Sequence, residues 1–350
     1  MRSPSGMATC FFAVLIVAIA GCSGASGVSV FGNPGSPSAP SNPAITTSVY
    51  VVQLSSSGGG SVLQLGAPPT RSGAPISSLT QPAEASFLSV ATDSSGLIYV
   101  GAATDDGSEI LVYPAGSTGP SATPARTIVG SSTSFTHPYL MTVDSNGQLY
   151  ISDEFSCNCV SVFSNTANGT ATPLRLIQGD LTQIADPVAI AVDHSGYLYV
   201  ADAFGRSPFA PTSQGAQIEI FAPGATGNVA PVQVIVGTTA APLLPITGLA
   251  LDENSNIYVN HDFKIVEYTG TPAGSFVPTK TITPPAAETA SSSLQVDING
   301  NLYVLWLVAG GITPNISVYS ATGTGNATPQ LLFSSAMWTA TPAAGQFGLR

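Results

Sequence analysis

The chain has 350 residues, of which 8% are charged, with 8 Lys plus Arg against 19 Asp plus Glu and a formal net charge of −11. Phosphate binding needs clustered cations, so this composition argues against nucleic acid and anionic lipid headgroups as partners of the folded part. The length allows one large all-β domain or two smaller domains.

The chain begins with an export signal. Arg2 supplies a positive charge, and the apolar stretch 11–20 is too short to cross a bilayer as a helix. The next residues, Ile19-Ala20-Gly21-Cys22, resemble the bacterial lipobox, whose cysteine is acylated and becomes the first mature residue. We therefore predict a lipoprotein signal peptide at 1–21 and lipidation at Cys22. An ordinary signal followed by a chance cysteine is the alternative.

Residues 22–46 start with the lipidated cysteine and continue with Ser, Gly, Pro and Ala, with few bulky apolar side chains. Such a segment cannot bury enough surface to order itself, so we expect a disordered tether. The protein is then an exported bacterial lipoprotein, anchored to the membrane by its lipid alone, in the periplasm or on the cell surface.

A short pattern recurs six times after the tether. Each copy contains Tyr followed by Val or Ile, and neighbouring copies are 49, 51, 49, 59 and 45 residues apart. Strand-rich units with this period are typical of propeller blades. We predict an all-β fold at 47–350, a six-bladed β-propeller of four-stranded blades, with the pairs Tyr50-Val51, Tyr99-Val100, Tyr150-Ile151, Tyr199-Val200, Tyr258-Val259 and Tyr303-Val304.

The third copy displays a whole blade, with strands expected at 140–144, 148–153, 160–163 and 173–179. An Asp turn, such as Asp144-Ser-Asn-Gly147, joins the first two strands in five copies. A calcium loop would need more oxygen ligands, so we interpret these turns as structural. A proline is expected to open each fourth strand, since the outermost strand tolerates a missing N–H donor.

The first copy lacks its opening strand, and residues 342–350 resemble the start of another copy. We therefore expect the C-terminal segment to supply the innermost strand of the first blade. This would close the ring between the N- and C-terminal segments and remove an open sheet edge.

The copies resemble a known repeat. The segments Pro187–Asp193, Gly196–Asp202 and Ile218–Phe221 look like the NHL repeat of six-bladed propellers, and five copies match well. The Asn-x-Arg that often precedes the third strand in that repeat is missing here. The broader group that the chain resembles includes gluconolactonase-like and streptogramin-lyase-like propellers, which are enzymes, so the resemblance alone does not choose a function.

The links between blades and the loops after each second strand are expected on one face, and the Asp turns on the other. Loops on a rigid scaffold commonly carry binding sites. The longest such loop, 203–215, offers aromatic and cationic side chains. The candidate binding face consists of Asp105, Asp106, His137, Asp153, Glu154, Asp202, Phe204, Arg206, Phe209, Asn260, His261 and Asp262.

A lactonase-like enzyme would need several oxygen ligands around one divalent metal. Asp153, Asp202 and Asn260 are the best candidates, with His137 as a further one. We take Gly101 and Leu305 as the corresponding positions in two other copies, which leaves the ring of ligands incomplete. We therefore expect neither a metal nor another cofactor.

Of the four cysteines, Cys10 lies in the predicted signal peptide and Cys22 is the predicted lipidation site, so Cys157 and Cys159 remain. A disulfide is the default for two thiols in an exported protein. Free thiols, or metal or redox chemistry, are the alternatives.

We expect a surface-tethered, non-catalytic binding or protein-interaction propeller of the cell envelope, whose partner is a protein, a small molecule or a glycan. The alternative is a metal-dependent lactonase-like hydrolase or lyase on the same fold, and a purely structural envelope protein is a third possibility. No serine-hydrolase, zinc-protease or nucleotide-binding motif is present.

Overall fold

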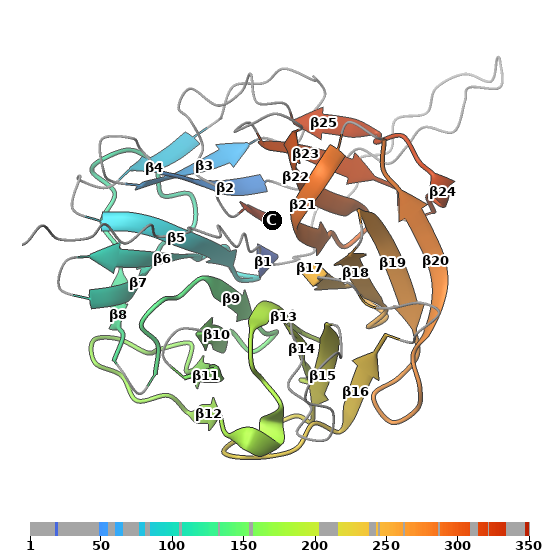
Figure 1. The fold of residues 1–350 in the computed structure, drawn as a ribbon. Coiled ribbons are helices and arrows are strands. Elements are labelled where there is room, and N and C mark those ends of the chain that lie inside the picture. Colours follow the sequence, from blue (N-terminus) through green and yellow to red (C-terminus); the bar gives the residue numbers. More distant parts are fainter. Residues whose placement is uncertain are drawn as a thin grey trace, which may run out of the picture.

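The computed structural model describes residues 18–19, 49–54, 60–65, 77–80, 85–104, 107–131, 134–153, 157–202, 216–237, 243, 246–261, 263–285, 288–308, 314–320, 322–333 and 347–349. These residues form six sheets arranged as blades around a centre, as predicted (Figure 1). The single helix among them is the short 3₁₀ helix η1 (Asp180–Thr182) between the third and fourth blades. None of the described helices has the length and apolarity needed to cross a membrane.

Each blade is a four-stranded antiparallel sheet. The blades are numbered in chain order, and the strands of each blade are given from the innermost outward. Blade 1 contains β26 (Phe347–Leu349), β2 (Val49–Leu54), β3 (Gly60–Leu65) and β4 (Ser77–Thr80), and blade 2 contains β5 (Ala85–Thr92), β6 (Ile98–Thr104), β7 (Gly107–Tyr113) and β8 (Arg126–Val129). Blade 3 contains β9 (Leu140–Val143), β10 (Leu149–Asp153), β11 (Cys159–Phe163) and β12 (Arg175–Ile177).

The second half of the ring repeats this order. Blade 4 contains β13 (Pro187–Val192), β14 (Leu198–Asp202), β15 (Gln217–Phe221) and β16 (Gln233–Val236). Blade 5 contains β17 (Ile246–Leu251), β18 (Ile257–His261), β19 (Lys264–Thr269) and β20 (Val277–Thr283), and the short β24 (Gly325–Asn326) pairs parallel with β20 at its edge. Blade 6 contains β21 (Glu288–Val296), β22 (Leu302–Val308), β23 (Pro314–Tyr319) and β25 (Leu331–Phe333).

The two ends of the propeller sequence meet in blade 1. β26 pairs antiparallel with β2, and the register places Val49 opposite Leu349 and Val51 opposite Phe347. The prediction that the C-terminal segment supplies the innermost strand is therefore confirmed, and blade 1 lies beside blade 6 (Figure 1). A further short strand, β1 (Ala18–Ile19), pairs parallel with β26. β1 belongs to the predicted signal peptide, so cleavage of that peptide would leave the four strands of blade 1 intact.

The predicted third strands all form, but the fourth strands begin later than expected in five blades. In blade 3 the strand covers Arg175–Ile177 rather than 173–179, so Pro173 lies outside the ladder. The backbone N–H of Leu174 already donates to Val162 O at 2.8 Å, and Gln178 N donates to Gly227 O in blade 4. The residues at the two ends of the predicted strand therefore bond to β11 and to the next blade. Only in blade 5 does the proline, Pro278, lie inside the strand.

Apolar side chains fill the spaces between neighbouring blades. Six separate clusters of buried residues occupy the six interfaces. Because side chains alternate along a strand, Tyr150 of β10 faces blade 4 whereas Ile151 faces blade 2. The position of a residue along its strand therefore decides which interface it enters.

Candidate functional site

The five Asp turns gather on one face of the ring. In each turn the aspartate Oδ1 accepts hydrogen bonds from the backbone N–H groups two and four residues later, at 2.8–2.9 Å. These bonds fold the link between the first and second strands. They agree with the interpretation of Asp93, Asp144, Asp193, Asp252 and Asp297 as turn residues.

The repeated tyrosine holds the other carboxylate oxygen. Tyr99 Oη donates to Asp93 Oδ2 at 3.3 Å, and the same bond joins Tyr199 to Asp193 and Tyr303 to Asp297. Burial and the nearby Asp93 raise the pKa of Tyr99 to about 12, so its hydroxyl remains a donor at neutral pH. The constant spacing of six residues between Asp and Tyr carries this signal, which the analysis of the sequence overlooked.

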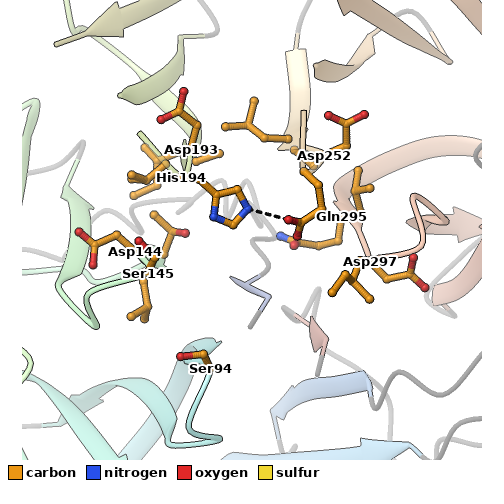
Figure 2. A pocket seen from close by; sticks show the side chains of 18 of the residues that line it. Ser94, Asp144, Ser145, Asp193, His194, Asp252, Gln295 and Asp297 are labelled. Atoms are coloured by element: carbon orange, nitrogen blue, oxygen red, sulfur yellow. Dashed lines mark ion pairs between the residues drawn. The ribbon is translucent and has the colours of Figure 1, made fainter. Parts of the chain in front are cut away.

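These turns surround the mouth of the central channel, where a cavity of about 210 Å³ opens (Figure 2). We call it the channel mouth. Its walls include the apolar side chains of Ile190, Leu249 and Val296. At its rim His194 Nε2 lies 2.9 Å from Glu253 Oε2, and these two side chains are 61% and 52% exposed.

A second hollow of about 260 Å³, which we call the blade 3–4 groove, lies beside the channel mouth. Arg175 lies along it, and its Nη2 donates to Gln148 Oε1 at 2.6 Å and to Tyr150 Oη at 2.8 Å. The opposite wall belongs to blade 4 and includes Pro223 and Gly224. This face of the ring lies opposite the predicted binding face.

The predicted binding face is only partly covered by the structure. His137, Asp153, Asp202, Asn260 and His261 are described. The other residues of this face lie outside the described residues, and these are Asp105, Asp106, Glu154, Phe204, Arg206, Phe209 and Asp262. The predicted lipidation site, Cys22, also lies outside them.

Both described aspartates of that face bind backbone. Asp153 Oδ2 accepts from Thr136 Oγ1 at 3.0 Å and from the N–H groups of Thr136 and His137. Asp202 accepts from the N–H groups of Ala185 and Asp186, at 2.6 and 2.9 Å. Each carboxylate therefore stabilises the link that enters its own blade, as expected of a structural repeat position.

The strand register corrects the comparison between copies. Asp202 lies opposite Pro187 and Gln217, and the residue in the same place in blade 5 is His261, opposite Ile246 and Lys264. The same register places Ala102 and Trp306 at this position in blades 2 and 6. Gly101 and Leu305 correspond instead to Asn260, one residue earlier on the strand.

This shift separates the three metal-ligand candidates. Asp153 bonds to the link between blades 2 and 3, and Asp202 to the link between blades 3 and 4. Asn260 pairs with Gly248, where an added Cβ would lie 2.9 Å from the backbone N of Leu294, so Asn260 faces blade 6. The three side chains enter three different interfaces. Among the described residues, no group of three or more His, Cys, Asp and Glu could hold a metal.

The structure adds a buried carboxyl group that the sequence analysis missed. Glu219 of β15 is fully buried, and its Oε1 accepts a hydrogen bond from Gln217 Nε2. Burial and, secondarily, the charge of Asp202 raise its pKa well above the usual range. The signal was an acidic residue at a position where the other five third strands carry Leu63, Leu111, Ser161, Val266 and Ser317.

Cys157 and Cys159 are joined by a disulfide, with their Cα atoms 5.1 Å apart. The bond lies next to the start of β11, and Cys157 Sγ is 3.8 Å from the carbonyl oxygen of Asp153. It therefore ties the loop after β10 to the strand that follows.

Comparison with solved structures finds this fold in other proteins. A protein of unknown function from Bacteroides caccae is 12% identical over 86% of this chain and 98% of its own, with a TM-score of 0.54. The periplasmic gluconolactonase of Pseudomonas aeruginosa is 12% identical over 86% and 98%, with a TM-score of 0.53. A protein from Lactobacillus plantarum is 12% identical over 87% and 99%, also at 0.53. These likenesses establish the propeller fold.

Sequence comparisons add nothing to this picture. No protein-family model matches the chain, and a search of curated proteins finds no match. The function therefore has to be inferred from the site itself.

Proposed function

We propose that this protein is a non-catalytic binding propeller of the bacterial cell envelope, in keeping with its resemblance to NHL-repeat proteins. The channel mouth carries the proposal. It is a concave site whose lining combines apolar side chains with a larger number of polar ones, and ligand sites in proteins are likewise concave with both kinds of group. A mouth of this kind can select a small ligand by shape and by a few hydrogen bonds.

The rim is poorly suited to acid–base or metal chemistry. Its turn aspartates spend Oδ1 on backbone donors, so these oxygens are committed to the turns. The His194–Glu253 pair is more than half exposed, and water screens such a pair strongly. Catalytic acids and bases usually lie in desolvated sites that shift their pKa.

The proposed location in the cell envelope rests on the predicted signal peptide at 1–21. Acylation of Cys22 would anchor the protein, and the tether at 22–46 would separate the propeller from the lipid headgroups. The folded part would then meet ligands in the periplasm or outside the cell.

Binding at the channel mouth can be tested by thermal-shift measurements with a panel of sugars, amino acids and nucleosides. Ser94→Trp places a bulky side chain on the rim, and Thr118→Trp is the matched control on an exposed turn of blade 2. A compound that raises Tm in wild type and Thr118→Trp but not in Ser94→Trp supports the proposal. Turnover of that compound, or stabilisation of all three proteins alike, contradicts it.

A lactonase-like hydrolase is the second candidate, and the similarity in fold to the periplasmic gluconolactonase of Pseudomonas aeruginosa favours it. The described residues do not assemble the metal site that such an enzyme would need. Hydrolysis of glucono-1,5-lactone, followed against the spontaneous rate, tests this candidate. A rate that exceeds the spontaneous one and falls with EDTA and in Asp202→Ala would establish the enzyme instead.

A further inference from the structure

The channel mouth and the blade 3–4 groove adjoin each other. Both are lined by Asp144, Ser145, Asp193 and His194, which stand on the facing turns of blades 3 and 4 (Figure 2). Each hollow alone is smaller than the ~300–1,000 Å³ of typical ligand sites, whereas the two together reach that range. An elongated ligand could therefore start in the channel mouth and continue outward between the blades.

Arg175 has hydrogen-bond donors to spare in this groove. The equivalent residue of blade 2, Arg126, also follows its proline by two residues, and its Nη1 donates to Ala167 O at 2.8 Å. Arg175 uses only Nη2, and within the described part of the chain its Nη1 and Nε make no hydrogen bond. A ligand oxygen in the groove would supply the acceptor that Arg126 finds in the protein.

The surrounding charges favour a neutral ligand. Asp144 and Asp193 line the groove with Arg175, and no lysine or second arginine is among the described residues that line it. An anion would meet two fixed carboxylates, and a cation would meet the guanidinium group. A hydroxyl group can accept from arginine and donate to a carboxylate or serine, so it suits both.

We propose that the blade 3–4 groove binds a neutral saccharide, and this proposal rests on the binding function proposed above. Hydroxyl groups of the sugar would accept hydrogen bonds from Arg175, and one end of the saccharide would lie in the channel mouth. Ser145, Asn146 and Ser195 supply further hydroxyl and amide groups along the groove. Pro223 offers an apolar surface for the C–H face of a sugar ring.

Calorimetric titration of the exported protein, in a detergent without a sugar headgroup, tests the proposal. The probes are maltotriose, cellotriose and triacetylchitotriose, with trigalacturonate as the anionic counterpart. We expect one neutral trisaccharide to bind. Arg175→Gln should raise its Kd at least about tenfold because a charged hydrogen bond is lost, and Arg126→Gln should change it less than about twofold. Thermal melts verify that both variants fold.

A second pair of variants leaves Arg175 in place. Ser195→Trp fills the groove from the exposed turn of blade 4, and Asn254→Trp is the same turn position in blade 5, outside both hollows. Only the first should abolish saccharide binding. Preference for trigalacturonate, equal loss in Arg175→Gln and Arg126→Gln, or no trisaccharide binding at millimolar concentration would overturn the assignment. A ligand blocked by Ser94→Trp but indifferent to Arg175→Gln would retain the binding function and reject the groove.

Discussion

At the scale of single residues, Glu219 differs from its counterparts in the other blades. Its carboxyl group is buried on the face of blade 4 that also carries Val200, which is its partner on the neighbouring strand, and Gln217 is its hydrogen-bond donor. Ionising a carboxyl group in such surroundings is costly, which raises the pKa of this group well above its usual range.

We predict that Glu219→Gln makes stability less dependent on pH. The folded pKa lies above the ordinary value of 4.5. The stabilisation is therefore fully present below 4.5 and is lost as pH rises through the folded pKa. Glutamine keeps the acceptor oxygen for Gln217 and never ionises. In urea unfolding, the variant should gain stability over wild type between about pH 5 and pH 8. The exposed Glu253→Gln is the control, and a gap that does not change with pH would contradict the prediction.

The Asp–Tyr hydrogen bond of the turns in blades 2, 4 and 6 can also be tested with single substitutions. Tyr199→Phe removes the bond to Asp193 Oδ2, and we expect a loss of about 1 kcal/mol in unfolding free energy. Tyr268→Phe is the control, because Tyr268 has no hydroxyl hydrogen bond within the described residues. Equal effects of the two substitutions in urea unfolding would mean that the bond contributes nothing.

At the scale of strands and turns, ring closure depends on the three residues of β26. They cover the edge of β2 that would otherwise offer unpaired N–H and C=O groups. Blade 1 differs in this respect from the other blades, whose four strands come from one stretch of sequence.

We predict that deleting residues 345–350 destabilises the whole domain, because the deletion removes β26 and exposes the edge of β2. Tm should fall by about 5 °C or more. Deleting Arg350 alone is the control, since β26 ends at Leu349. An unchanged melting temperature in the longer truncation would show that the ring closes without this strand.

At the scale of the whole molecule, acylation of Cys22 would connect the propeller to a membrane. We predict that Cys22→Ser moves the protein from the membrane fraction to the soluble fraction, because acylation requires the thiol. Membrane fractionation with immunodetection measures this. Cys10→Ser, within the leader, should leave the distribution unchanged. Wild-type protein that is soluble after export would refute the lipobox interpretation.

Much of the architecture could be predicted from the sequence because it depends on short-range sequence patterns. Alternation along strands, Asp turns and a period near 50 residues predicted six blades, and the copy without its first strand predicted closure by the C-terminal segment. The role of Asp93 and its counterparts as turn residues was predictable for the same reason. Each of these features depends on residues close together in the chain.

The candidate site was decided by contacts between residues about 50 positions apart. Pleating sends Asp202 toward blade 3 and Asn260 toward blade 6, because Asp202 follows the repeated tyrosine by three residues and Asn260 follows it by two. Likewise Glu219 becomes a buried acid, and Arg175 the floor of a groove, only when blade 4 packs against blade 3. Local sequence patterns are enough to specify the blades and their closure. Which side chains meet depends on strand register and on the neighbouring sheet, so it follows only from the packing between blades.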